Sequence, residues 1–257
     1  MTVRTDTHGP VGHLVIDRPE VANAFDGPTV RALHGGLDAL VADPAVRVIV
    51  LRSVGKAFSA GADLAWMRRM GEAGFDENLA DAAALAALLA AVDRSPKPVV
   101  ARVQGASMAG ATGLVAAADV AIASEAAVFA VTEVRLGLVP AVISPYLVRA
   151  MGLRQTRRLA LTAERFDAET AAVLGLVHGA VPAEELDARV DAVVADFLKA
   201  SPAALAAAKD LFRTVAPLPG DDLIADTARR IAERRMSLDA REGLAAFFAK
   251  RPPDWSL

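Results

Sequence analysis

Short runs rich in valine and isoleucine alternate with alanine- and leucine-rich stretches through the first half of the chain. The runs predict strands, because branched side chains pack well on a pleated sheet. They cover residues 11–17, 47–53, 98–104, 119–123 and 128–130. Helical stretches are predicted to begin between them, near Pro28, Ala62, Glu77 and Met108. Repeated succession of strand and helix predicts an α/β layer structure.

The chain after about residue 145 has a different pattern and is predicted to be helical throughout. Consecutive amphipathic helices are expected over residues 154–162, 168–174, 183–200, 202–215, 221–236 and 239–250. Ser201-Pro202 and the Pro-Leu-Pro-Gly run at residues 217–220 are expected to separate some of these helices. The chain therefore divides into an α/β part and a helical part.

Charge and cysteine content exclude several classes of function. The 257 residues carry a formal net charge of -3, so no excess of positive charge favours nucleic acid or an anionic membrane. The chain has no cysteine, which excludes disulfides, thiolate metal sites and a cysteine nucleophile and fits a reducing compartment.

The longest uncharged run, residues 103–118, is shorter than the ~18 apolar residues of a membrane span. The first ten residues lack the apolar core of a signal peptide, so a cytoplasmic location is expected.

Several common catalytic motifs are missing from the chain. No metal site is predicted, because no metal-ligand spacing connects the four histidines, His8, His13, His34 and His178. The G-x-S-x-G motif of serine hydrolases and the G-x-G-x-x-G motif of dinucleotide-binding proteins are both absent. Residues 105–113 resemble a phosphate-binding loop, but Ala111 stands where that loop needs a lysine.

Two glycine-containing turns, residues 55–64 and 105–113, each follow a predicted strand and open a predicted helix. Backbone N–H groups at such a turn point outward at the positive end of the helix dipole, where anions bind. Together the two turns can present two N–H groups to one oxygen, which is an oxyanion hole. For either turn alone, close packing of a helix on a strand is the alternative explanation of the small residues.

Glu133 is one carboxylate in the mostly apolar window of residues 131–140. Burial in such a window would raise its pKa toward the range that is useful for proton transfer. A surface glutamate paired with nearby Arg135 is the alternative.

Five motifs resemble, in order, those of the crotonase superfamily of enoyl-CoA hydratases and isomerases, and the resemblance covers essentially the whole chain. They are DRPEVANA at 17–24, AFSAGADL at 57–64, VQGASMAGATGL at 103–114 with Asp119, the segment 133–140, and EGLAAFFAK at 242–250. The resemblance implies an α/β fold: a crotonase-type ββα spiral over residues 1–195, and a helical C-terminal trimerisation region over residues 196–257. It also implies an acyl-CoA thioester as the substrate, no separate cofactor because coenzyme A is part of that substrate, and a homotrimer or homohexamer.

The resemblance also implies roles for individual residues. Glu133 would be the catalytic residue, and the amides of Ala60 and Gly110 would hold the thioester oxygen. The residues implied to bind CoA are Val21, Ala22, Gly61, Ala62, Asp63, Phe247 and Lys250. The residues implied to form the acyl pocket are Trp66, Met67, Gly113, Ile143 and Tyr146. Phe247 and Lys250 match positions that can reach a neighbouring subunit's nucleotide, and docking of their helix on its own subunit is the alternative.

The chain departs from the family at Gly113, where standard hydratases carry the first of two glutamates that hold the water molecule. With Glu133 alone, a hydratase would activate water for attack at C3 and return a proton to C2, and Gly113 would leave room for a branched acyl group. An isomerase would use Glu133 to move a proton from C2 to C4 of a 3-enoyl-CoA. Residues 61–70, 113–119 and 138–146 resemble bacterial methylglutaconyl-CoA hydratase-like proteins, which favours hydration of a branched 2-enoyl-CoA. A non-catalytic acyl-CoA-binding protein is the remaining alternative.

Overall fold

The computed structural model describes residues 2–200, 202–215 and 221–252. The separators expected at Ser201 and at residues 217–220 therefore lie outside the described residues. A main sheet of six strands has the order β1-β2-β3-β4-β6-β9. The strands are β1 (Val3–His8), β2 (Val11–Ile16), β3 (Val48–Ser53), β4 (Val99–Val103), β6 (Val120–Ser124) and β9 (Gly179–Val181). β1 is antiparallel to β2, and every later pairing in this sheet is parallel.

A second sheet consists of three short strands in the order β5-β7-β8. These strands are β5 (Ala106–Met108), β7 (Val128–Ala130) and β8 (Phe166–Asp167). The helices are α1 (Gly27–Ala42), α2 (Leu64–Glu72), α3 (Phe75–Arg94), α4 (Gly110–Ala117), α5 (Ser144–Thr162), α6 (Ala168–Leu174), α7 (Leu186–Leu198), α8 (Pro202–Val215), α9 (Asp221–Arg235) and α10 (Leu238–Phe248). Three short 3-10 helices are η1 (Pro19–Val21), η2 (Glu133–Leu136) and η3 (Ala183–Glu185).

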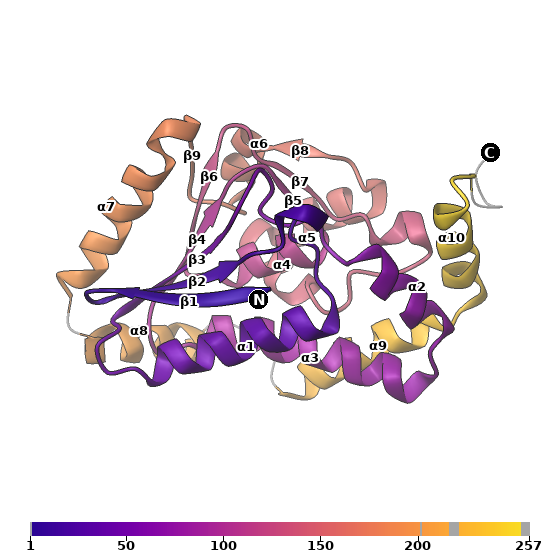
Figure 1. Ribbon diagram of the computed structural model, residues 1–257, viewed down its shortest axis with the longest axis horizontal. Helices are drawn as coiled ribbons and strands as arrows, with labels where there is room; N and C mark the ends of the chain where they lie inside the picture. Colours follow the sequence, from indigo (N-terminus) through magenta and orange to yellow (C-terminus); the bar gives the residue numbers. More distant parts are fainter. Residues whose placement is uncertain (1, 201, 216–220, 253–257) are drawn as a thin grey trace.

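Helices cover both faces of the main sheet, with α1 and α3 on one side and α7 on the other (Figure 1). Strand β3 shows why, since successive side chains point to opposite faces. Ile49 and Leu51 belong to the larger core, beneath α1 and α3. Val48 and Val50 belong to a smaller core that α7 covers. The predicted α/β layer structure is confirmed, and so is a helical C-terminal region.

The structure corrects the expectation that the second half is entirely helical, because β8 and β9 lie there. Strand β1 was also missed, since only Val3 of its six residues is buried and an edge strand of polar residues carries no hydrophobic pattern. Helix α5 begins at Ser144, ten residues before the expected helix, and includes a break at Gly152 with φ of 73°. The boundary expected between residues 195 and 196 falls inside α7, which ends at Leu198.

Chain segments that are distant in sequence meet on the side of the molecule where α2 and α10 lie (Figure 1). The two glycine-containing turns are joined there, because Ser59 N–H donates to the Ala106 carbonyl at 2.9 Å and Met108 N–H to the Ser59 carbonyl at 3.0 Å. Helix α2 starts at the last residue of the first turn, α4 starts inside the second turn, and η2 starts shortly after β7. No helix in the described ranges is long and apolar enough to cross a membrane.

Candidate functional site

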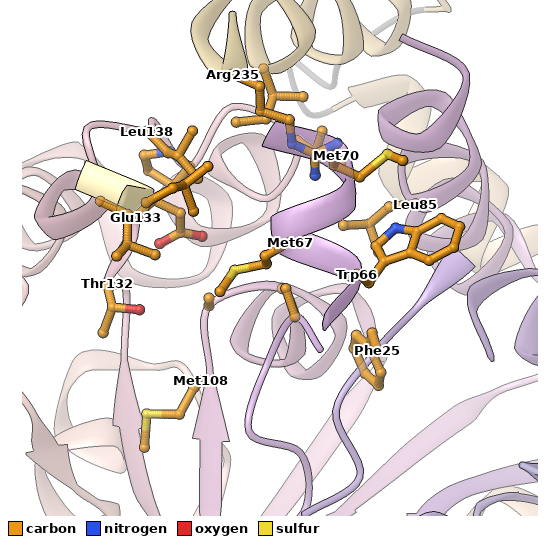
Figure 2. A pocket seen from close by; sticks show the side chains of 18 of the residues that line it. Phe25, Trp66, Met67, Met70, Leu85, Met108, Thr132, Glu133, Leu138 and Arg235 are labelled. Carbon is orange, nitrogen blue, oxygen red and sulfur yellow. The ribbon is translucent and has the colours of Figure 1, made fainter. Parts of the chain in front are cut away.

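A cavity of about 510 Å³ opens between the two turns, η2, α2, α3, α9 and α10. Its wall is mostly apolar, and its volume lies within the ~300–1,000 Å³ that small-molecule sites occupy. Glu133 and Leu138 lie on one side of it, and Trp66 and Phe25 lie on the other (Figure 2). Residues of the two turns that are candidates for anion binding also line the cavity.

The first turn is held in place by hydrogen bonds on both of its sides. Phe25 N–H donates to the Gly61 carbonyl at 2.6 Å, and Asp63 N–H donates to the Phe25 carbonyl at 2.8 Å. The Asp63 carboxylate accepts from the N–H groups of Ala65 and Trp66, at 3.0 and 3.1 Å, and so caps α2. Gly61 has a φ of 88°, and a Cβ there would lie 3.0 Å from the Met108 carbonyl oxygen of the second turn.

The amide that the first turn offers to the cavity belongs to Ala62 rather than Ala60. Ala60 N–H donates to the Ala22 carbonyl at 2.9 Å, so the role expected for the Ala60 amide is wrong. The two backbone hydrogen bonds of Phe25 are with the Gly61 carbonyl and the Asp63 N–H, the groups before and after Ala62. The N–H of Ala62 itself has no hydrogen-bond partner among the described residues. Ala62 lines the cavity, and its amide is therefore the one available to a ligand.

The second turn offers the amide of Gly110. Gly110 is the first residue of α4 and lines the cavity, and its N–H has no partner within the part of the chain that the structure describes. Ala109 before it has φ 49° and ψ -116°, a conformation that costs a non-glycine residue about 1–3 kcal/mol. The Ala109 N–H donates to the Ala130 carbonyl at 2.8 Å, which helps to hold this strained turn. Nothing in the sequence indicates the strain at Ala109.

Glu133 is the first residue of η2 and lines the cavity. Its Oε2 atom is buried and has no hydrogen-bond partner among the described residues. Loss of solvent raises the pKa of Glu133 to about 7, although backbone hydrogen bonds at Glu133 and Thr132 oppose the shift. Arg135 is exposed and forms no ion pair with Glu133 in the described structure, so the surface-pair alternative does not apply.

The raised pKa of Glu133 predicts a pH dependence of stability. The unfolded chain releases this proton near the ordinary pKa of 4.5, whereas the folded protein keeps it until about pH 7. The free energy of unfolding should therefore fall as the pH rises from 4.5 to 7, by up to about 3 kcal/mol from this one group. Urea unfolding of the wild type and of Glu133→Gln across this range measures the effect, since the variant has no group here to titrate. If the free energy of unfolding changed equally with pH in the wild type and in Glu133→Gln, Glu133 would not be desolvated.

Gly113 does not open the acyl pocket, contrary to the sequence expectation. A Cβ at Gly113 would overlap Ile143 Cγ2 and lie 2.5 Å from Ile143 Cβ, so the space beside this glycine is already filled. Ile143 lines the cavity, together with Trp66 and Met67. Tyr146 of α5 is buried in the hydrophobic core and is not among the residues that line the cavity.

Replacement of Gly113 by alanine is therefore expected to destabilise the protein by about 1–3 kcal/mol, the usual cost of overpacking. Gly110→Ala is the matched control, because a Cβ there lies 3.6 Å from Leu85 Cδ2, an ordinary contact. Adding Ile143→Ala to Gly113→Ala removes the nearest atom, so the double variant should lose less stability than the two single variants together. Urea unfolding of the wild type and the four variants measures these effects, and strict additivity would contradict the contact.

The residues implied to bind CoA fall into two groups in the structure. Val21 and Ala22 lie in and directly after η1, beside the first turn that contains Gly61, Ala62 and Asp63. Of the two residues near the C-terminus, Phe247 lines the cavity, and exposed Lys250 does not. Arg251, which the sequence analysis did not single out, lines the cavity and donates hydrogen bonds to Glu242 at 2.6 and 2.7 Å.

A polar group that sequence reasoning missed forms part of the cavity wall. The Asp81 carboxylate accepts from Trp66 Nε1 at 2.9 Å and from Arg235 Nη1 at 2.8 Å. The three side chains come from α3, α2 and α9, and Arg235 lies in the upper part of Figure 2, above Met70. Asp81 stands in an alanine-rich helix with no motif around it, so only the tertiary structure identifies it. Among the described residues, no group of three or more His, Cys, Asp or Glu side chains could hold a metal ion.

Comparison with known proteins gives consistent matches over nearly the whole chain. The family model described as enoyl-CoA hydratase/isomerase matches residues 6–257. The crystal structure of an enoyl-CoA hydratase from Shewanella pealeana is similar with a TM-score of 0.82 and 41% identity, over 99% of this chain and 96% of that one. That of an enoyl-CoA hydratase from Mycobacterium avium has a TM-score of 0.85 and 37% identity, over 99% of both chains. The trans-2-decenoyl-[acyl-carrier-protein] isomerase of Streptococcus mutans is 31% identical over 252 residues, 96% of this chain and 94% of that protein.

Proposed function

Because the chain belongs to the enoyl-CoA hydratase/isomerase family, we propose that it is a hydratase that adds water across the 2,3 double bond of a 2-enoyl-CoA thioester. The observation that carries the proposal is the Glu133 carboxyl group, whose buried Oε2 atom has no hydrogen-bond partner among the described residues. It lines the same cavity as the free amides of Ala62 and Gly110. Family membership also confirms the resemblance to the crotonase superfamily and the expected crotonase fold.

The chemistry follows from these three groups. The amides of Ala62 and Gly110 donate to the thioester oxygen, and they stabilise the negative charge that gathers there when water attacks C3. Glu133 as a carboxylate takes a proton from the attacking water, and its carboxyl form then returns a proton to C2. A pKa of about 7 lies near neutral pH, where one group can both accept and return a proton efficiently.

The acyl group would lie against Trp66, Met67 and Ile143, which line the apolar part of the cavity. A branched acyl chain in the substrate is proposed on the sequence resemblance alone, because Ile143 fills the space expected beside Gly113. Assembly as a homotrimer or homohexamer and a cytoplasmic location also stay predictions.

Isomerisation of a 3-enoyl-CoA is the second candidate, and the residue at position 113 favours it. Gly113 supplies no carboxyl group to act with Glu133, and Ile143 fills the space beside it. Transfer of a proton from C2 to C4 needs one base and no bound water, so Glu133 alone suffices for it.

Incubation of the purified protein with crotonyl-CoA, 3-methylglutaconyl-CoA and a 3-enoyl-CoA in deuterated water separates these functions by mass spectrometry. Addition of water to a 2-enoyl-CoA supports the hydratase. Faster turnover of 3-methylglutaconyl-CoA than of crotonyl-CoA supports a branched acyl chain. Conversion of the 3-enoyl-CoA without added water identifies an isomerase. Acyl-CoA binding that Glu133→Gln does not change, with no product from any substrate, identifies a non-catalytic binder and overturns both enzymatic proposals.

A further inference from the structure

Helix α10 packs directly on the 3-10 helix that carries Glu133. Gly243 is buried in α10 and faces the backbone of Leu136, the last residue of η2. A Cβ at position 243 would lie 2.5 Å from both the carbonyl carbon and the carbonyl oxygen of Leu136, and 3.0 Å from its Cα. Protein interiors are close-packed, and main-chain atoms cannot rotate away as a side chain can. Only glycine fits at this point without a shift of one element.

The backbone of Leu136 is connected to Glu133 through a single helical turn. The N–H of Gly137 donates to the carbonyls of Glu133 and Val134. The N–H of Leu138 donates to the Glu133 carbonyl at 3.0 Å. A displacement of Leu136 therefore moves Glu133 unless these hydrogen bonds break.

Helix α10 has little room to retreat from η2, because it also contacts α2. A Cβ at Gly71 of α2 would lie 3.1 Å from Leu244 Cδ1, and Leu244 is buried. The Arg68 guanidinium of α2 lies 4.3 Å from the centroid of the Phe248 ring. Figure 1 shows α10 beside α2 at the same end of the molecule. Helix α10 is thus held between α2 and η2.

We propose that Gly243 is a positioning residue for Glu133, because a position without a side chain lets α10 close over η2 and shield the carboxyl group from water. The inference rests on the proposed role of Glu133 in proton transfer. A side chain at position 243 would separate α10 from η2, move the carboxyl group relative to the two amides, and admit water to it. Burial is the cause of the raised pKa of Glu133, so this pKa reports directly on the closure.

The test compares Gly243→Ala with Gly35→Ala, a matched control in α1 whose new Cβ would meet no atom within 4 Å. Carbon-13 NMR titration of labelled glutamate carboxyl groups gives the pKa of Glu133, with its signal assigned by its loss in Glu133→Gln. The pKa should fall from about 7 toward 4.5 in Gly243→Ala and stay unchanged in Gly35→Ala. An unchanged pKa in folded Gly243→Ala would overturn the proposal.

A second variant covers the case in which Gly243→Ala does not fold. Phe248→Ala removes the ring that lies 4.3 Å from the Arg68 guanidinium of α2, so it loosens α10 without adding an atom against η2. A smaller fall in the pKa of Glu133 is expected for this variant. If Phe248→Ala has to decide the question, a pKa equal to that of the wild type overturns the proposal.

Kinetics provide the second readout. In Gly243→Ala, kcat should fall roughly 10- to 100-fold, as expected for a misplaced catalytic group, while KM changes much less. A wild type that turns over no enoyl-CoA would defeat the proposed function, yet the NMR titration would still decide whether Gly243 positions Glu133. An active wild type combined with unchanged kcat and pKa in Gly243→Ala would defeat the positioning role alone.

Discussion

Replacement of Glu133 by glutamine is expected to lower kcat roughly 10²- to 10⁴-fold, the usual loss when one proton-transfer group is removed. That loss corresponds to about 3–5 kcal/mol in the activation barrier. Glutamine has nearly the same shape as glutamate, so it preserves the packing of η2 while it removes the group that exchanges the proton. Steady-state kinetics on the preferred enoyl-CoA measure the effect, and affinity for a saturated acyl-CoA should stay near that of the wild type.

Glu169→Gln is the matched control, since Glu169 is exposed in the first turn of α6, and it should turn over substrate like the wild type. Turnover that survives in Glu133→Gln would show that another group transfers the proton. The assignment of Glu133 would then be wrong, even though its carboxyl group is buried in the cavity.

Replacement of Gly110 by proline should lower kcat roughly 10²- to 10³-fold, because it removes one of the two amides proposed to stabilise the oxyanion. Gly110 is the first residue of α4, a position where helices tolerate proline because the N–H makes no bond within the helix. Gly110→Ala is the control, since it adds a Cβ that meets Leu85 at 3.6 Å and keeps the N–H.

The alanine variant should keep kcat within about a few-fold of the wild type, and circular dichroism should show that both variants fold. Full activity in both the proline and the alanine variants would mean that the Gly110 amide does not bind the thioester oxygen. Loss of activity in both would instead place the effect in the shape of the turn.

The buried strands of the main sheet could be predicted because they carry runs of valine and isoleucine. Strands β3 and β4 are apolar on both faces, so their signal survives without any knowledge of their neighbours. Strand β1 exposes most of its residues, and β8 has only two, so neither has a local signal. Their existence depends on partners elsewhere in the chain, which periodicity does not report.

In the site, too, features that depend on the local sequence could be predicted, and features that depend on tertiary contacts could not. The apolar neighbours of Glu133 predicted its burial and raised pKa, because the cause lies in the adjacent sequence. The choice between the amides of Ala60 and Ala62 depends on which carbonyl each one meets, and the pairing of Phe25 with Ala62 decides it. Gly113 suggested an empty space, but Ile143 from a distant segment fills it.

The packing of α10 on η2 has a consequence for how the protein is made. A ribosome adds roughly 5–20 residues per second, so Glu133 is synthesised seconds before Gly243. On the positioning role proposed for Gly243, the Glu133 side chain stays hydrated and charged until α10 covers η2. The nascent chain can then become competent for catalysis only after α10 has been synthesised and has docked.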